Sequence, residues 1–169
     1  LGGVPGVAPA SVVIIGGGIV GTEAAKIAAG MGADVIVLDK SLERLKYLDE
    51  IYNKRFITLF ASSKNIAGAV EAADMIIGAV LVPGASAPKV LKKAQLPNLK
   101  KGSVLVDVAI DQGGCFESSY ATTHDNPTYF VNDILHYCVA NMPGAVPRTS
   151  TIALSNATMP YIITLANKG

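Results

Sequence analysis

Two carboxylates lie four residues apart in VDVAIDQGG, residues 106–114. The stretch begins as an apolar run typical of a buried strand, and Asp107 inside it is interpreted as a structural acid that bonds backbone. Asp111 follows where the strand should end, and the strand ends of an open α/β sheet face the ligand crevice. A carboxylate there can exchange protons with a reacting group. The alternative is that Asp111 caps a turn formed by Gly113 and Gly114, and spacing alone favours neither role.

A glycine-rich stretch, GGGIVG at residues 16–21, has the spacing G-x-G-x-x-G. The pattern alone is a weak signal. Here it follows a β-branched apolar run, opens an Ala-rich helical pattern, and precedes another strand that ends in an acid. In that context Gly16 allows a tight turn, Gly18 lets backbone approach a pyrophosphate, and Gly21 lets the helix pack on the strand. The alternative is a strand–helix turn that binds no ligand.

The first helical turn after these glycines contains Ile19 and Val20. Free backbone N–H groups and the positive end of the helix dipole at such a position can hold phosphates. The sequence therefore predicts that this turn contacts a dinucleotide.

Asp39 lies 18 residues after Gly21, at the end of the second apolar run. An acid in this place accepts hydrogen bonds from the adenosine ribose and repels a 2′-phosphate, which favours NAD over NADP. The neighbouring Lys40 and Arg44 keep NADP open, and the alternative for Asp39 itself is a solvated acid that caps the next helix.

The segment HYCVANMPGAVPRTST, residues 136–151, contains a second polar residue at an expected strand end, Asn141. Its amide offers both a donor and an acceptor and could orient a carboxamide or a substrate, or it could simply make a turn. Arg148 could bind an acidic ligand, although a surface role is favoured. His124 and His136 have no close metal partners and are interpreted as structural or solvated, and we predict no metal site.

These groups need a scaffold that brings strand ends together. Apolar runs predict strands at 11–15, 34–39, 56–61, 74–81 and 103–109, with further candidates at 128–131 and 136–140. Helical spacing predicts helices at 19–31, 41–52 and 65–73, near 89–94, and at 149–166, the last broken or bent near Pro160. The alternation predicts an α/β fold of Rossmann type: a doubly wound, mainly parallel sheet with helices on both faces. We expect residues 1–169 to form one NAD-binding-type domain with a linker-like start at 1–10.

The composition excludes several classes of protein. Half of the chain is hydrophobic and 16% is charged, so disorder is excluded. The net charge is +1 with scattered basic residues, which argues against nucleic acid as a partner. The apolar runs suit a covered parallel sheet rather than a membrane span. Cys115 and Cys138 have no metal-like spacing and are interpreted as free thiols in a reducing compartment, the cytoplasm.

Several long strings together resemble bacterial alanine dehydrogenase over essentially the whole chain. They are GGVPGV (2–7), GGGIVGTEAA (16–25), IGAVLVPGASAPK (77–89), VDVAIDQGGCFE (106–117), CVANMPGAVPRTSTIALSNATMPY (138–161) and LANKG (165–169). The resemblance implies reversible oxidative deamination of L-alanine to pyruvate and ammonia with NAD, in a homo-oligomer that is commonly a hexamer. It places Asp111 and Asn141 at the catalytic centre. It also implies cofactor contacts by Asp39, Arg44, Val80, Leu81, Val108, Val139 and Met142.

Members of that family are much longer than this chain. Their substrate domain carries an Arg, a Lys and an acid/base His that have no counterpart here, and we expect residues 149–169 to lead back toward such a domain. The expectation is therefore an NAD-binding domain that turns over alanine negligibly by itself. The alternatives are a stand-alone NAD-binding or sensing module, the NAD-binding domain of a related transhydrogenase, and an assembly unit that uses the apolar 149–166 segment as an interface.

Overall fold

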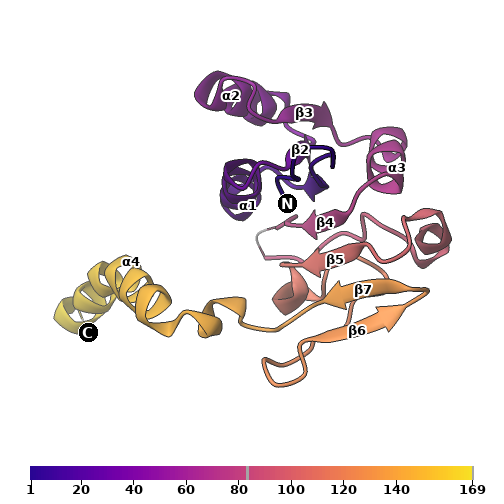
Figure 1. Cartoon of the computed structure of the whole chain (residues 1–169). Coiled ribbons are helices and arrows are strands. Elements are labelled where there is room, and N and C mark those ends of the chain that lie inside the picture. The colour runs from indigo at the N-terminus through magenta and orange to yellow at the C-terminus, as the bar shows by residue number, and fades with distance from the viewer. Residues whose placement is uncertain (83, 169) are drawn as a thin grey trace.

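A single seven-stranded sheet organises the chain in the computed structural model, which describes residues 1–82 and 84–168 (Figure 1). The strand order is β3-β2-β1-β4-β5-β7-β6, and every neighbouring pair is parallel except β6 with β7. The strands are β1 (Ser11–Ile15), β2 (Asp34–Asp39), β3 (Ile57–Phe60), β4 (Met75–Gly78), β5 (Val104–Asp107), β6 (Thr128–Val131) and β7 (Ile134–Tyr137). The predicted Rossmann-type fold is confirmed.

The described residues also form four α-helices and three short 3₁₀ helices. They are α1 (Ile19–Gly30), α2 (Leu42–Tyr52), α3 (Ser63–Glu71), α4 (Pro147–Lys168), η1 (Lys93–Asn98), η2 (Ile110–Gln112) and η3 (Met142–Ala145). Of these, η3 and α4 follow the last strand, and the others lie between strands. Helix α2 begins after Ser41, whose side chain accepts the Arg44 N–H, and α3 begins in the same way after Ser62.

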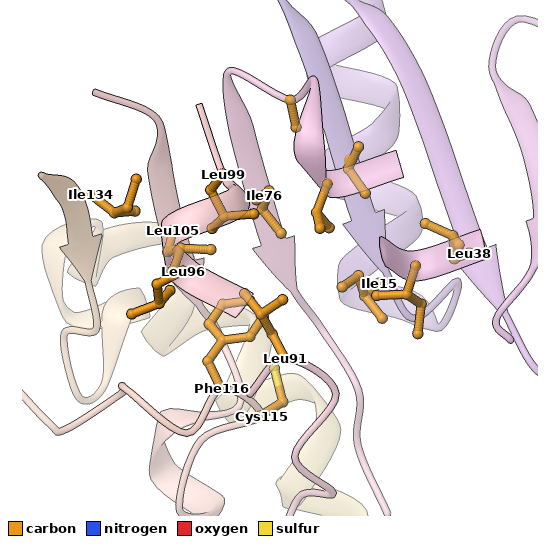
Figure 2. Close-up of a cluster of buried hydrophobic side chains, with 14 of the residues drawn as sticks. Ile15, Leu38, Ile76, Leu91, Leu96, Leu99, Leu105, Cys115, Phe116 and Ile134 are labelled. Carbon is orange, nitrogen blue, oxygen red and sulfur yellow. The ribbon is translucent and has the colours of Figure 1, made fainter. Parts of the chain in front are cut away.

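The sheet has a hydrophobic core on each face, because alternate residues of a strand point to opposite sides. In β1, Val12 and Ile14 join the core beneath α1 and α2, whereas Val13 and Ile15 join the core beneath α3 and η1. The second core, shown in Figure 2, also contains Ile76 of β4 and extends to β7. Burial on both faces explains why β1, β2 and β4 read as unbroken apolar runs.

The predicted strand at 136–140 is wrong in its bounds. Strand β7 is Ile134–Tyr137, and it forms an antiparallel hairpin with β6. Asn132 and Asp133 connect the two strands with φ of 51° and 62°, the left-handed values that a two-residue hairpin turn requires. Asn141 consequently lies beyond the strand and not at its end.

The predicted helix near residues 89–94 is also wrong. The chain is extended through Lys92, and only Lys93–Asn98 forms a 3₁₀ helix. Residues 87–91 instead make backbone hydrogen bonds to the loop after β5. Within the expected PGASAP break, Pro83 lies outside the described residues.

Helix α4 is unbroken from Pro147 to Lys168, whereas the sequence predicts a helix at 149–166 that is broken or bent near Pro160. It runs through Pro160, whose ring nitrogen cannot donate to the carbonyl of Asn156. Because Asn156 is exposed, water can satisfy that carbonyl. The helix extends away from the sheet (Figure 1), and no described residue of it is buried. Within the described chain, no helix combines the length and apolar character needed to cross a bilayer.

The first ten residues have more structure than a linker. Val4 and Val7 exchange two backbone hydrogen bonds of 3.2 and 2.8 Å around a tight turn. Gly2 lies directly against Met31 and Gly32, which follow α1, and a side chain at residue 2 would meet the Met31 carbonyl. This segment therefore packs on the amino-terminal edge of the sheet, opposite the strand ends where the site lies.

Candidate functional site

The turn from β1 to α1 needs its glycines for three different reasons. Gly16 has φ of 105°, and a Cβ there would lie 2.6 Å from the Ala79 carbonyl oxygen. A Cβ on Gly21 would collide with the Gly16 carbonyl oxygen, so only glycine lets α1 pack this closely. A Cβ on Gly18 would meet nothing within 4 Å. Gly18 thus exposes backbone to open space.

The amino terminus of α1 faces this open space. Gly18 precedes its first turn and makes no side-chain cap, and the turn contains no acidic residue. Its first N–H groups therefore have no helical partner and lie at the positive end of the helix dipole. Ile19 and Val20, the residues of this turn, are exposed. The arrangement suits an anionic group.

Asp39 and Arg44 hold the middle glycine of the turn from two sides. Asp39 Oδ2 accepts the Gly17 N–H at 2.7 Å, and its Oδ1 accepts the Ser41 N–H at 2.8 Å. Arg44 Nε donates to the Gly17 carbonyl at 2.5 Å, while Nη2 donates to Thr22 Oγ1 at 2.8 Å. The guanidinium of Arg44 thus lies behind the turn, whereas Asp39 lines the cleft described next.

A mainly apolar cleft of about 580 Å³ opens between the ends of β1 and β4. The sheet order reverses at these two strands, which is where open α/β sheets bind ligands. Of the predicted cofactor contacts, the cleft is lined by Gly16, Gly18, Ile19, Val20, Asp39, Val80 and Leu81. The nine other described lining residues are not among the predicted cofactor contacts: Ile15, Leu38, Lys40, Ala61, Ile66, Ala79, Val82, Pro88 and Val90.

Asp107, at the end of β5, is a structural acid as predicted. It is fully buried, and its carboxylate accepts the N–H groups of Ala109 at 3.1 Å, Cys115 at 2.9 Å and Phe116 at 3.2 Å. Burial raises the pKa of the Cys115 thiol, which lies 3.5 Å from Asp107 Oδ1, so this cysteine is a poor nucleophile. The result is a closed loop, residues 108–114, with Asp107 at its base.

Asp111 lies in this loop, within η2, and not at the end of the strand. It is exposed, and Asp111 Oδ1 accepts the backbone N–H of Asn141 at 3.3 Å. The alternative role, a cap on the turn at Gly113 and Gly114, has no hydrogen bond from Asp111 among the described residues. The two residues predicted for the catalytic centre, 30 positions apart in sequence, are thus neighbours.

Asn141 is held at both ends of its backbone. Its φ of 53° is left-handed, a conformation that asparagine tolerates well. The Asn141 carbonyl lies 3.0 Å from His124 Nε2 and can only accept, so His124 donates. No spacing signal connects His124 with this pair, because the contact joins two loops that only the fold brings together.

The other predicted residues differ in burial. Val108 is half-buried and donates its N–H to the Gly78 carbonyl at 2.9 Å. Val139 is fully buried beside Thr122, and Met142 is half-buried at the start of η3. Arg148 is exposed in the first turn of α4. Within residues 1–82 and 84–168, no group of three or more His, Cys, Asp or Glu side chains is placed to hold a metal ion.

His136 belongs to a buried polar cluster below the loops. Its Nδ1 lies 3.0 Å from the Ile134 carbonyl and its Nε2 lies 2.7 Å from Ser118 Oγ. Because the carbonyl only accepts, Nδ1 carries the proton and the neutral ring accepts the Ser118 hydroxyl at Nε2. The Tyr129 ring stacks on the imidazole with centroids 4.9 Å apart. The interpretation of His136 as structural is confirmed, and Cys115 and Cys138 are both free and buried as expected.

We predict that His136 makes the fold sensitive to acid. Burial lowers the pKa of His136 below its ordinary value of 6.5. The unfolded chain therefore binds more protons than the folded chain just below pH 6.5, and the free energy of unfolding falls as the pH falls. One proton accounts for at most about 1.4 kcal/mol per pH unit. Urea denaturation between pH 7.5 and 5 should show a shallower pH dependence for His136→Gln, and an unchanged slope would contradict the prediction.

The fold and the cleft together define a class: a Rossmann-type nucleotide-binding domain with its ligand site at the switch point of the sheet. The family model described as alanine dehydrogenase/PNT, C-terminal domain, matches residues 1–169, and the chain belongs to that family. It is 61% identical over its whole length to the alanine dehydrogenase of Halomonas elongata and 59% identical to that of Methanococcus maripaludis, covering 46% of each relative.

Solved structures agree with this assignment. An L-alanine dehydrogenase superposes with a TM-score of 0.94 at 54% identity, covering all of this chain and 47% of the other. A transhydrogenase from Sinorhizobium meliloti superposes with a TM-score of 0.82 at 22% identity, which shows a shared fold alone. The chain spans about half the length of the curated relatives that it matches.

Proposed function

We propose that this chain binds NAD(H) across the cleft and forms the cofactor half of an alanine dehydrogenase, which converts L-alanine, water and NAD to pyruvate, ammonia and NADH. One observation carries the proposal. Gly18 exposes backbone at the uncapped start of α1, in the same cleft as Asp39. Anionic phosphates suit the helix start, and a ribose diol suits the carboxylate.

The apolar lining supports the orientation of the dinucleotide. Asp39 lies at the β2 side of the cleft, whereas Val80 and Leu81 follow β4 on the other side. The adenosine end therefore belongs near Asp39 and the nicotinamide end near β4 and β5. That direction leads toward the loop after β5, which carries Asp111.

The Asp111–Asn141 pair would act on the substrate. NAD held in the cleft would supply the hydride acceptor for oxidation of the L-alanine α-carbon, and hydrolysis of the oxidised substrate would release ammonia and pyruvate. Asp111 Oδ1 accepts the Asn141 N–H, which leaves Oδ2 to exchange a proton with the amine or with the attacking water. The Asn141 side-chain amide can orient substrate or carboxamide because its backbone is fixed by Asp111 and His124.

Two further features support an oligomer in a reducing compartment. Helix α4 exposes Leu154, Tyr161 and Leu165 to more than 60% each, which is apolar area that a monomer leaves in water. Both cysteines are buried and free.

Binding of the reduced cofactor is the direct test. NADH titrated into the protein should give a saturable fluorescence change, with at least about tenfold weaker binding of NADPH, a difference of about 1.4 kcal/mol. Asp39→Asn should weaken NADH binding and reduce the difference in affinity between NADH and NADPH. Asp34→Asn, at the opposite end of β2, is the matched control and should change neither. Absent or non-saturable NADH binding would exclude the proposed function, and equal affinity for both cofactors would exclude the role of Asp39.

A further inference from the structure

Lys89 makes an unusual pair of contacts with the loop that carries Asp111. Its ammonium Nζ donates to the Gly113 carbonyl at 2.6 Å and to the Gly114 carbonyl at 2.7 Å. Both glycines are left-handed, with φ of 87° and 74°, so their two carbonyls are presented to one donor group. An ammonium carries three donors and no acceptor, and hydrogen bonds from a charged donor are stronger than neutral ones.

The backbone around Lys89 follows the same loop. Ala87 N donates to the Gln112 carbonyl at 3.1 Å, and Val90 N donates to the Cys115 carbonyl at 2.8 Å. Leu91 pairs with Phe116 in a parallel bridge, and Figure 2 shows their side chains together in the core. Residues 87–91 thus form an extended segment that is hydrogen-bonded along one side of the loop. Asp107 binds the other end of the loop through Cys115 and Phe116.

The same segment, residues 87–91, forms part of the cleft wall. Pro88 and Val90, the two neighbours of Lys89 in the chain, line the cleft. Successive side chains of an extended segment point to opposite sides, which explains why Lys89 reaches the loop while its neighbours face the cleft. A ligand in the cleft that contacts Pro88 and Val90 therefore contacts the same segment that carries Lys89, whose ammonium binds the loop.

We propose that Lys89 is a positioning residue that anchors the Asp111 loop to the cleft wall, so that occupancy of the cleft and the position of Asp111 are coupled. The anchor is needed at this point because Gly113 and Gly114 restrict their own backbone less than any other residues do. The anchoring part rests on the contacts alone. The coupling part rests on the proposed function, since it requires a dinucleotide in the cleft.

Three single substitutions, made in the full-length protein, test the anchoring and the coupling. Lys89→Met keeps the length of the side chain but removes the charge, and Lys89→Arg restores a cationic donor. Lys93→Met is the matched control, because Lys93 is an exposed lysine whose side chain makes no hydrogen bond to the described residues of the loop. All three substitutions are at exposed positions, so the fold should be retained, and circular dichroism verifies this.

Hydrogen–deuterium exchange without cofactor tests the anchor. Amides of residues 112–116 should exchange about tenfold faster in Lys89→Met, since two charge-assisted bonds are lost. Lys89→Arg should recover at least part of the protection, and Lys93→Met should match the wild type. Equal exchange in Lys89→Met and the wild type would overturn the proposal.

Exchange with saturating NADH tests the coupling. NADH should protect residues 112–116 from exchange in the wild type and protect them less in Lys89→Met. In Lys89→Met, kcat for alanine should fall by a larger factor than the factor by which the KM for NAD changes. If NADH protects residues 112–116 equally in the wild type and in Lys89→Met, the coupling is refuted and Lys89 only anchors the loop. A wild type that does not bind NADH refutes the proposed function and the coupling together, whereas the cofactor-free experiment still decides the anchor.

Discussion

Replacing Asp111 with Asn should lower kcat for oxidative deamination of alanine by about 10²–10⁴-fold, the usual contribution of a positioned acid–base group. The substitution is conservative in geometry, because the Asn oxygen can still accept the Asn141 N–H that Asp111 Oδ1 accepts at 3.3 Å. Only the ability to take and return a proton is lost. Asp111 does not line the cleft, so NADH affinity should stay within about threefold, or 0.7 kcal/mol, of the wild type.

The measurement is NAD reduction with L-alanine, together with NADH titration, in the protein as its gene encodes it. Asp125→Asn is a suitable control, because Asp125 is an exposed carboxylate in a neighbouring loop that makes no hydrogen bond to Asn141. Near-normal turnover in Asp111→Asn would show that this loop binds or senses without taking part in the chemistry. A loss of NADH affinity as large as the loss of kcat would instead assign Asp111 to cofactor binding.

Local rules predict the steric demands of the glycine turn and the backbone bonds of Asp107. The three glycines act through sterics within one turn, and each reason proposed for them corresponds to a close approach or an open space in the structure. The apolar run around Asp107 predicts an acid bonded to backbone, and Asp107, the last residue of β5, accepts three backbone N–H groups. Such effects span few residues, so spacing in the sequence is sufficient to identify them.

Local rules of spacing and periodicity do not predict contacts between loops that are distant in the sequence. His124 reaches Asn141 across 17 residues, and Lys89 reaches Gly113 across 24, and neither pair has a periodic or spacing signal. The segment 89–94 was predicted as a helix, although its backbone bonds to a distant loop instead. One error was avoidable, because Asn132 and Asp133 between two apolar runs are typical of a two-residue hairpin turn, which would have placed β7 correctly.

Replacing Gly18 with Val should abolish measurable cofactor binding without unfolding the protein. The new Cβ would meet no atom within 4 Å, so the fold has room for it, but that room is the part of the cleft at the start of α1. A branched side chain there keeps phosphates away from the first N–H groups of the helix. Losing two hydrogen bonds to a charged group corresponds to about 3–6 kcal/mol, or at least about a 100-fold increase in Kd for NADH.

A valine at the other end of the same helix separates this effect from helix propensity. Gly30 is exposed, ends α1 and also has nothing within 4 Å, but it lies away from the cleft. Gly30→Val should therefore leave NADH binding unchanged, while both variants keep the circular dichroism and urea midpoint of a folded protein. If Gly18→Val bound NADH as tightly as Gly30→Val, the phosphates could not lie at the start of α1. The glycine turn would then be a steric requirement of β1 and α1 packing, and the cofactor would have to be sought elsewhere along the strand ends.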